Sequence, residues 1–390
     1  MKRIAIIFQG DLKNRKGLVN ACLSRIKHLY PLVDYQIDLY VINEYDTWLS
    51  SILRKKFYRR SLPTVYELDG LKIQMIWKRF SLLNYLIVQK LHLNPIEDNT
   101  FNNKNIARFK NYDLISAHSH LAASLAYTIF EKFGIKYCVS WHGSDIHTIP
   151  FMNKLYFQNI KQCIKSAQCN FFVSRKLLSI SDKICQSDNK IVLYNGVGDD
   201  FVNFSPSQKW KIRQLYNKES YKIVGFVGNL IDVKNVLVLP TIFKNITSLY
   251  HGNVQFWIIG DGNLASKLES LLQESGINFK MWGNQPVHVM PAIMNCIDVL
   301  VLPSKNEGLP LVVLEAMACG ANVVGSDVGG IKEAIGENNV FALDEKFVTN
   351  ITHRIVYMLK NEVKQSLSDK FSWDNTAFLE NTFYKDILNR

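Results

Sequence analysis

The sequence LPSKNEGLPLVVLEAMACG, residues 302–320, decides the fold of the second half of the chain. An apolar run opens this stretch, as in a buried strand, and Pro310 stands where the first residue of a helix is favoured. The N–H groups in the first turn of a helix have no partners within it. We therefore expect the backbone of Gly308, Leu309 and Leu311 to form a site for phosphate or sugar oxygens.

Two glutamates belong to the same stretch. Glu307 comes just before the predicted helix, where a carboxylate either accepts hydrogen bonds from sugar hydroxyls or simply complements the helix dipole. Glu315 lies inside the helix among valine, leucine, alanine and methionine side chains. Because a carboxylate in such apolar surroundings usually has a partner, we interpret Glu315 as a binding group.

Short apolar runs alternate with helical patterns along the rest of the chain. Strands are expected at residues 4–8, 37–42, 113–117, 137–141, 170–174, 191–194, 223–227, 254–259, 299–302 and 322–324. This order predicts an α/β fold of parallel sheets, whose ligands bind beyond the carboxyl ends of the strands. The polar stretch 195–221 divides the chain into a domain at 1–200, a second at 201–370 and a final helix at 371–390.

Charge is unevenly distributed over the 390 residues. Hydrophobic residues make up 47% and charged residues 21%, which is typical of a globular protein and excludes disordered, collagen-like and coiled-coil proteins. The net charge is +12: residues 1–200 hold 28 Lys and Arg against 16 Asp and Glu, and the remainder holds 18 of each. The two halves are therefore expected to meet different partners.

Cysteine usage and hydropathy limit the cellular setting. The seven cysteines are scattered and never spaced C-x-x-C, so they predict neither a disulfide framework nor a zinc site and favour a reducing cytoplasm. The apolar run at residues 4–8 is too short for a secretory signal. No run approaches the ~20 residues that span a bilayer. The sequence predicts a cytoplasmic protein, at most peripheral to a membrane.

Residues 46–93 interrupt the alternation of strands and helices. They contain two runs in which basic and aromatic side chains alternate, at 54–60 and 77–87. Such runs suit the headgroup layer of an anionic membrane, and a solvated helix pair packed on the domain is an equal interpretation. Nucleic acid binding is not expected, because no recognised binding motif accompanies these runs.

Several motifs together resemble the donor-binding signature of retaining glycosyltransferase family 4, the group 1 glycosyl transferases of bacterial surface-polysaccharide type. They are the Glu-x7-Glu spacing at 307–315 and the segments 141–145 (WHGSD), 225–230 (GFVGNL), 259–262 (IGDG), 316–320 (AMACG), 328–333 (VGGIKE) and 371–373 (FSW). The resemblance implies the GT-B fold. In that fold two Rossmann-like doubly wound domains face a central cleft, and the C-terminal helix packs back on the first domain.

The resemblance also implies roles for residues of the second half. Glu307 would hydrogen-bond the donor sugar, assisted by the backbone of Gly308 and Leu309. Glu315 would hold the ribose hydroxyls. Lys234 would neutralise the diphosphate and the leaving nucleotide. The other donor-contacting positions that it implies are Gly10, Asn229, Gly283, Asn284, Pro310 and Leu311.

In the first half the resemblance points to His142, which lies near the donor sugar and the incoming acceptor in that family. Asp145 is a candidate for orienting the acceptor or stabilising charge. His118 and His120 follow the preceding strand, and their alternation predicts that one faces the cleft and the other the core. Their spacing alone does not make them a zinc pair.

Asn229 departs from the family, which usually has arginine there to grip the diphosphate together with the lysine. Lys305, in the loop before Glu307, is a candidate for supplying the missing charge. The chain contains no Asp-x-Asp pair, the usual holder of a metal-bound diphosphate. We therefore expect no metal ion and no other cofactor.

These observations predict a retaining transferase that moves a hexosyl unit from a nucleotide diphosphate sugar, UDP-sugar favoured over GDP-sugar, to an acceptor hydroxyl. The basic first half favours a lipid-linked saccharide acceptor in polysaccharide, lipopolysaccharide or capsule assembly, at the inner face of the cell membrane. A nucleotide-sugar epimerase and a non-catalytic partner subunit on the same fold are the alternatives. An epimerase needs no separate acceptor, and a partner subunit needs no intact Glu307, Lys234 or His142.

Overall fold

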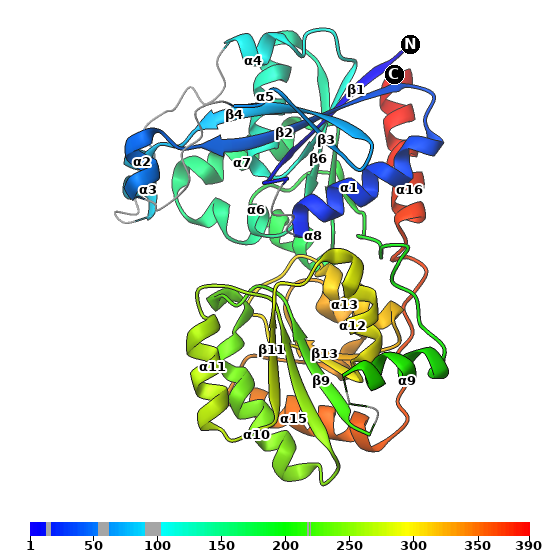
Figure 1. Cartoon of the computed structure of the whole chain (residues 1–390). Helices are drawn as coiled ribbons and strands as arrows, with labels where there is room; N and C mark the ends of the chain where they lie inside the picture. The colour runs from blue at the N-terminus through cyan, green and yellow to red at the C-terminus, as the bar shows by residue number, and fades with distance from the viewer. Residues whose placement is uncertain (13–16, 54–61, 90–102, 217, 219) are drawn as a thin grey trace. The chain divides into compact units, whose positions relative to one another are not determined.

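The computed structural model describes residues 1–12, 17–53, 62–89, 103–216, 218 and 220–390. The chain forms two compact units (Figure 1). Unit 1 consists of Met1–Asn195 together with Trp373–Arg390, and unit 2 consists of Gly196–Ser372. Each unit has its own parallel sheet and its own apolar core. The predicted α/β architecture of two Rossmann-like domains is thereby confirmed.

The described strands of unit 1 form an eight-stranded sheet in the order β3-β4-β2-β1-β5-β6-β7-β8. All neighbouring strands are parallel except β3 and β4. The strands are β1 (Arg3–Gln9), β2 (Gln36–Tyr45), β3 (Val65–Leu68), β4 (Leu71–Arg79), β5 (Leu114–His118), β6 (Lys136–Trp141), β7 (Cys169–Phe172) and β8 (Lys190–Val192). The apolar side chains of β1, β5, β6 and β7 are buried, as is typical of parallel strands covered on both faces.

The helices of unit 1 come from both ends of the chain. They are α1 (Gly17–Leu29), α2 (Trp48–Leu53), α3 (Leu82–Gln89), α4 (Asn103–Ala107), α5 (His120–Phe133), α6 (Ser144–His147), α7 (Lys154–Ser166), α8 (Arg175–Asp182) and α16 (Trp373–Asn389). In Figure 1 the red α16 lies against the blue α1. This confirms the prediction that the C-terminal helix packs on the first domain.

Unit 2 is built on a six-stranded sheet of described strands, all parallel, in the order β11-β10-β9-β12-β13-β14. The strands are β9 (Lys222–Val227), β10 (Val254–Ile259), β11 (Phe279–Gly283), β12 (Val299–Leu302), β13 (Asn322–Ser326) and β14 (Val340–Phe341). The helices are α9 (Pro206–Leu215), α10 (Leu239–Leu249), α11 (Ala265–Glu274), α12 (Met290–Cys296), α13 (Leu311–Ala318), α14 (Ile331–Ile335) and α15 (Phe347–Lys360).

The register of the unit 1 sheet brings two histidines to the same edge. Phe8 pairs with His118 between β1 and β5, and His118 pairs with Ser140 between β5 and β6. Because parallel strands end at the same edge of a sheet, His118 closes β5 beside the point where β6 runs into His142.

The stretch 46–93 contains strands that the sequence analysis did not predict. β3 and β4 form a hairpin whose turn, Asp69-Gly70, has positive φ at both residues, as a two-residue hairpin turn requires. Trp77, Lys78 and Arg79 therefore lie on β4 and not on a helix, which corrects the helix-pair interpretation for this part. The basic run at 54–60 lies outside the described residues.

Two further findings concern the setting of the chain. All seven cysteines are free thiols and all are buried. None of the helices in the described part of the chain is both long enough and apolar enough to cross a membrane.

The contact between α1 and α16 is centred on a buried ion pair. Arg25 is 2% exposed and Glu380 is 1% exposed, and the guanidinium donates to the carboxylate. Removing one partner of such a pair leaves the other charge buried without compensation, which typically costs about 3–5 kcal/mol. We expect Glu380→Gln to lower the free energy of unfolding of unit 1 by about that amount, measured by urea titration.

Asp374→Asn provides the matched control on the same helix. Its carboxylate is 85% exposed and pairs with His28, so we expect its loss to change stability by less than about 0.5 kcal/mol. Equally small changes in the free energy of unfolding for Glu380→Gln and Asp374→Asn would show that the buried pair of Arg25 and Glu380 does not stabilise unit 1.

Candidate functional site

The loop between β12 and α13 carries the stretch that the sequence analysis singled out. The helix begins at Leu311, and Pro310 is its N-cap with an extended backbone, one residue earlier than predicted for a first helical residue. Proline suits this position because its φ of −72° lies near the value that its ring imposes. Gly308, Leu309 and Pro310 are all buried, so the loop is packed against unit 2.

The Glu307 carboxylate is held by two side chains. Its Oε1 accepts a hydrogen bond from Lys234 Nζ at 2.5 Å and another from Ser304 Oγ at 2.7 Å. Ser326 Oγ in turn donates a hydrogen bond to the Ser304 carbonyl oxygen. The side chains of Lys234 and Glu307 are 19% and 10% exposed, so solvent screens this ion pair only partly. The structure thus brings together two residues predicted to act on the same ligand.

Gly329 lets a neighbouring loop approach Glu307. Its φ is +53°, and a Cβ atom added there would lie 2.2 Å from the Glu307 carbonyl oxygen. The next residue, Gly330, donates its N–H to the Gly308 carbonyl oxygen at 2.6 Å. The VGG motif therefore acts on the candidate site by fixing the backbone of residues 307 and 308.

Glu315 lies on α13, and its carboxylate makes no hydrogen bond or ion pair with the described residues. Burial raises the pKa of its carboxyl group to about 7. A half-buried carboxylate without a protein partner is suited to accept hydrogen bonds from ligand hydroxyls.

The remaining donor-side residues lie at or beyond the ends of strands β9, β11 and β12. Asn229 follows β9, and its carbonyl oxygen accepts the N–H of Ile231. Gly283 ends β11, where its carbonyl oxygen accepts the N–H of Gly260 at 2.8 Å, and Asn284 comes next. Lys305 is exposed and pairs with Asp232 at 2.7 Å, so its charge is already shared with a carboxylate in this structure.

In unit 1 the loop after β6 is organised by Asp145. The carboxylate accepts the backbone N–H of His142 at 3.0 and 3.1 Å and that of Gly143 at 2.7 Å. Burial raises the pKa of Asp145 to about 6, and these backbone hydrogen bonds oppose the rise. Because both oxygens are occupied by the backbone, Asp145 positions His142.

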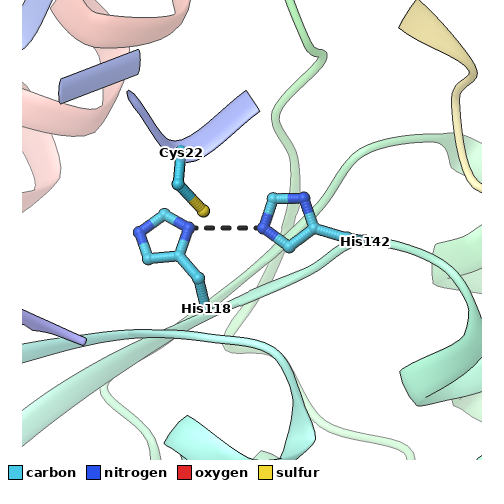
Figure 2. A group of neighbouring side chains, drawn as sticks. All are labelled: Cys22, His118 and His142. Carbon is cyan, nitrogen blue, oxygen red and sulfur yellow. Dashed lines mark hydrogen bonds between the residues drawn. The ribbon is translucent and has the colours of Figure 1, made fainter. Parts of the chain in front are cut away.

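Figure 2 shows that His142 points toward His118 and Cys22. His118 Nδ1 lies 3.3 Å from His142 Nε2, and the three residues offer ligand atoms within 4.8 Å of one another. Burial, with the charge of Arg25, lowers the pKa of both histidines, to about 3 for His142, while burial raises that of the Cys22 thiol.

This cluster fits a metal ion poorly, although neutral imidazoles are good ligands. A thiol must lose its proton to bind a metal, and the positive charge next to this cluster, on Arg25, disfavours a cation. The two imidazoles also satisfy each other by a hydrogen bond. The absence of a metal requirement stays a prediction.

The two histidines after β5 have different surroundings. His118 is 1% exposed and is the one that reaches His142. His120 begins α5, is half-buried, and meets the edge of the Tyr156 ring at 6.5 Å between centroids. Burial and Lys78 lower its pKa to about 4.

Gly10 follows β1, and its N–H donates to the Ile42 carbonyl oxygen at 3.2 Å. A Cβ atom there would lie 2.3 Å from Val19 Cγ2 on α1. Glycine at this position therefore leaves room for Val19 on α1, and the predicted phosphate contact of Gly10 stays a prediction.

The sequence analysis missed the residues that support these candidates. Ser304 stands three residues before Glu307, so a search for polar residues in that loop would have found it. Cys22, Arg25, Glu380 and Tyr384 gave no local signal, because each acts on residues more than 90 positions away in the chain.

Comparisons with known proteins show what the chain is similar to. Residues 208–372 match the family model described as glycosyl transferases group 1. An uncharacterized glycosyltransferase of Methanocaldococcus jannaschii, MJ1178, is 27% identical over 73% of this chain and 78% of its own. The N-acetyl-alpha-D-glucosaminyl L-malate synthase of Bacillus anthracis is 25% identical over 73% of this chain and 77% of its own.

Solved structures show the same fold across the whole chain. Sucrose-phosphate synthase from Thermosynechococcus elongatus superposes with a TM-score of 0.76, 16% identity and full coverage of both chains. Anabaena Alr3699/HepE in complex with UDP gives a TM-score of 0.68, 17% identity, and coverage of 100% and 98%. The fold is that of the GT-B glycosyltransferases. Within it, the part that matches the glycosyl transferases group 1 model lies in unit 2.

The raised pKa of Glu315 predicts a pH dependence of stability. The folded-state pKa of about 7 exceeds the ordinary value of 4.5, so the stabilising contribution of Glu315 is present below pH 4.5 and is lost as the pH rises through 7. We expect Glu315→Gln to match the wild type at pH 4.5. At pH 8, without nucleotide sugar, it should be more stable by up to about 3 kcal/mol.

Chemical denaturation at the two pH values measures this difference. Glu274→Gln, on the exposed face of α11, is the control and should change stability at neither pH. A stability difference between Glu315→Gln and wild type that is the same at both pH values would contradict the assignment.

Proposed function

We propose that the protein is a retaining glycosyltransferase that moves a hexosyl unit from a nucleotide diphosphate sugar to an acceptor hydroxyl. The observation that carries this proposal is the start of α13, where Lys234 and Ser304 hold the Glu307 carboxylate and Glu315 lies about one turn into the helix. The site combines a cation, two carboxylates and a helix N-terminus, which is what a sugar diphosphate requires.

Each of these groups has a distinct task in the proposed reaction. Lys234 has three N–H donors and uses one on Glu307, so it retains donors for the diphosphate. Glu307 accepts hydrogen bonds from the donor sugar. Glu315 accepts them from the ribose, and these bonds favour its charged form.

In the proposed transfer, the bond between the anomeric carbon and the diphosphate oxygen breaks. The acceptor oxygen bonds to the same face of that carbon. The acceptor proton passes to an oxygen of the leaving phosphate, so no protein base is consumed. Lys234 stabilises the charge that develops on the diphosphate.

UDP-sugars are the favoured donors in this proposal. The support is the likeness in fold to Anabaena Alr3699/HepE, which was solved in complex with UDP. The relatives reported above carry glycosyltransferase or sugar-transfer names, which does not favour an epimerase or a non-catalytic subunit.

We further propose that the acceptor is a lipid-linked saccharide and that unit 1 meets an anionic membrane at the cytoplasmic face. The whole +12 excess of charge lies in residues 1–200. Helices α2 and α3 add an apolar surface: Trp48, Leu49, Ile52, Leu83, Tyr85 and Leu86 are all exposed. On α2 the serines Ser50 and Ser51 are buried, so the helix turns its apolar side outward. An outward apolar face next to basic sequence is typical of interfacial binding.

The donor proposal is tested with a panel of UDP-, GDP- and ADP-sugars. We expect a UDP-sugar to raise the melting temperature, because a ligand at 100 times its Kd stabilises by about 2.7 kcal/mol. Lys234→Met should abolish the shift. Lys244→Met, an exposed lysine on α10, should retain it. A chelator should leave both binding and turnover unchanged.

Two outcomes would contradict the donor proposal. One is the absence of a melting shift with every nucleotide sugar in the panel. The other is consumption of the nucleotide sugar at the same rate with and without an acceptor, which an epimerase would show.

The membrane proposal is tested by flotation with vesicles that contain anionic lipid. Trp48→Ser removes an exposed tryptophan of unit 1 and should weaken binding several-fold, at about 25 cal/mol per Å² of lost apolar contact. Trp210→Ser removes an exposed tryptophan of unit 2 and should leave binding unchanged. If Trp48→Ser floats as well as the wild type, α2 is not part of the membrane-binding surface, and a water-soluble anionic acceptor is favoured.

A further inference from the structure

A continuous row of hydrogen bonds crosses the interior of unit 1 from α16 to the histidine pair. The Glu380 carboxylate is bound by Arg25 on Oε2 and by the Tyr384 hydroxyl on Oε1. The Tyr384 hydroxyl also lies 2.5 Å from Ser116 Oγ. The row therefore begins at a buried ion pair and reaches β5.

The second part of the row joins β5 to β6. Ser116 Oγ lies 3.4 Å from His118 Nε2, and His118 Nδ1 lies 3.3 Å from His142 Nε2. Ser119 follows His118 with a φ of +89°, a strained value for a residue with a side chain. This strain is tolerated where the surrounding contacts fix the turn, and His118 is fixed on both ring nitrogens.

The carboxylate at one end sets the direction of every proton in the row. Paired with Arg25, the Glu380 carboxylate only accepts, so the single Tyr384 proton points to it. The Tyr384 hydroxyl is placed as a donor to both Glu380 and Ser116, but its single proton serves only one acceptor, and the charged carboxylate takes it. Ser116 therefore donates its own proton to the phenol oxygen and accepts from His118 Nε2–H. A neutral imidazole has one N–H, so His118 Nδ1 is an acceptor and His142 Nε2 is the donor.

We propose that Tyr384, Ser116 and His118 are positioning residues that hold His142 as the Nε2–H tautomer, so that its Nδ1 lone pair accepts a hydrogen bond from a sugar hydroxyl. The proposal rests on the proposed function for its catalytic consequence. His142 Nδ1 makes no hydrogen bond with the described residues, so it remains available for a ligand. The resemblance assigned His142 to the site and did not say which nitrogen faces the substrate.

The test uses Tyr384→Phe, which removes one hydroxyl and keeps the ring, and Ser116→Ala, which interrupts the row one step further on. Nitrogen-15 NMR of the full chain reads the tautomer of His142 without any turnover. We expect Nε2–H in the wild type and a mixture of tautomers in both variants. With the best donor of the panel, kcat should fall about tenfold while the donor KM stays within about twofold.

Tyr35→Phe is the matched control. Tyr35 is a buried tyrosine whose hydroxyl also binds α16, at 2.8 Å from Asn381 Oδ1, but it is not part of the row. Its loss should leave both the tautomer and kcat unchanged. This control separates a general loosening of α16 from the effect on His142.

Three results would overturn the proposal. The first is an unchanged His142 tautomer in both Tyr384→Phe and Ser116→Ala. The second is a changed tautomer with unchanged kcat. The third is tight binding of one equivalent of Zn²⁺, measured as loss of the ring nitrogen-15 signals of His118 and His142. His118 Nδ1 and His142 Nε2 would then be metal ligands and could not share a proton. A chain that turns over no nucleotide sugar contradicts the proposed function instead, and the tautomer is still measurable.

Discussion

A charge inside a protein must be paired, and the structure of unit 1 depends on the pair formed by Arg25 and Glu380. Its two partners come from α1 and α16, near opposite ends of the chain. Around it, Thr376 Oγ1 donates to the Tyr194 carbonyl oxygen, and Asn381 binds both Tyr35 and the Leu32 carbonyl oxygen. Polar contacts of this kind specify one position for α16, which apolar packing alone would leave less sharply defined.

The two units use different electrostatics for their candidate groups. In unit 1 the site consists of neutral imidazoles in a desolvated interior. The Asp145 carboxylate, three residues after His142, accepts hydrogen bonds from backbone N–H groups. In unit 2 a lysine and a glutamate form a partly exposed ion pair.

Sequence reasoning was most successful where the signal is local. The strands around residues 4–8, 254–259 and 299–302 are apolar runs, and such runs in a parallel sheet are recognisable without a partner. The Glu-x7-Glu spacing led to the start of α13, because the helix cap and both carboxylates lie within one short segment. The contact between Lys234 and Glu307 confirms only that these residues meet; their roles stay predictions.

The rest could not be predicted because its determinants are distant in sequence or were misread. The Asp69-Gly70 turn is a local hairpin signal. The basic and aromatic residues around it led instead to the interpretation as a membrane-binding segment or a helix pair. The role predicted for Asp145, orienting the acceptor or stabilising charge, stays a prediction, and its hydrogen bonds to the backbone of His142 and Gly143 gave no signal in the sequence. The row from Glu380 to His142 joins residues from α16, β5 and the loop after β6, and no pattern in one segment specifies such a path.

Because unit 2 lies between the two parts of unit 1 in the sequence, the first domain is finished last during synthesis. Arg25 leaves the ribosome 355 residues before Glu380, which at ordinary elongation rates is roughly 20–70 s earlier. Through that interval α1 has no counter-charge to bury, and unit 2 has time to fold by itself. In a nascent chain that stops before α16, the side of α1 that carries Arg25 stays exposed. In the finished chain the same side is buried against α16.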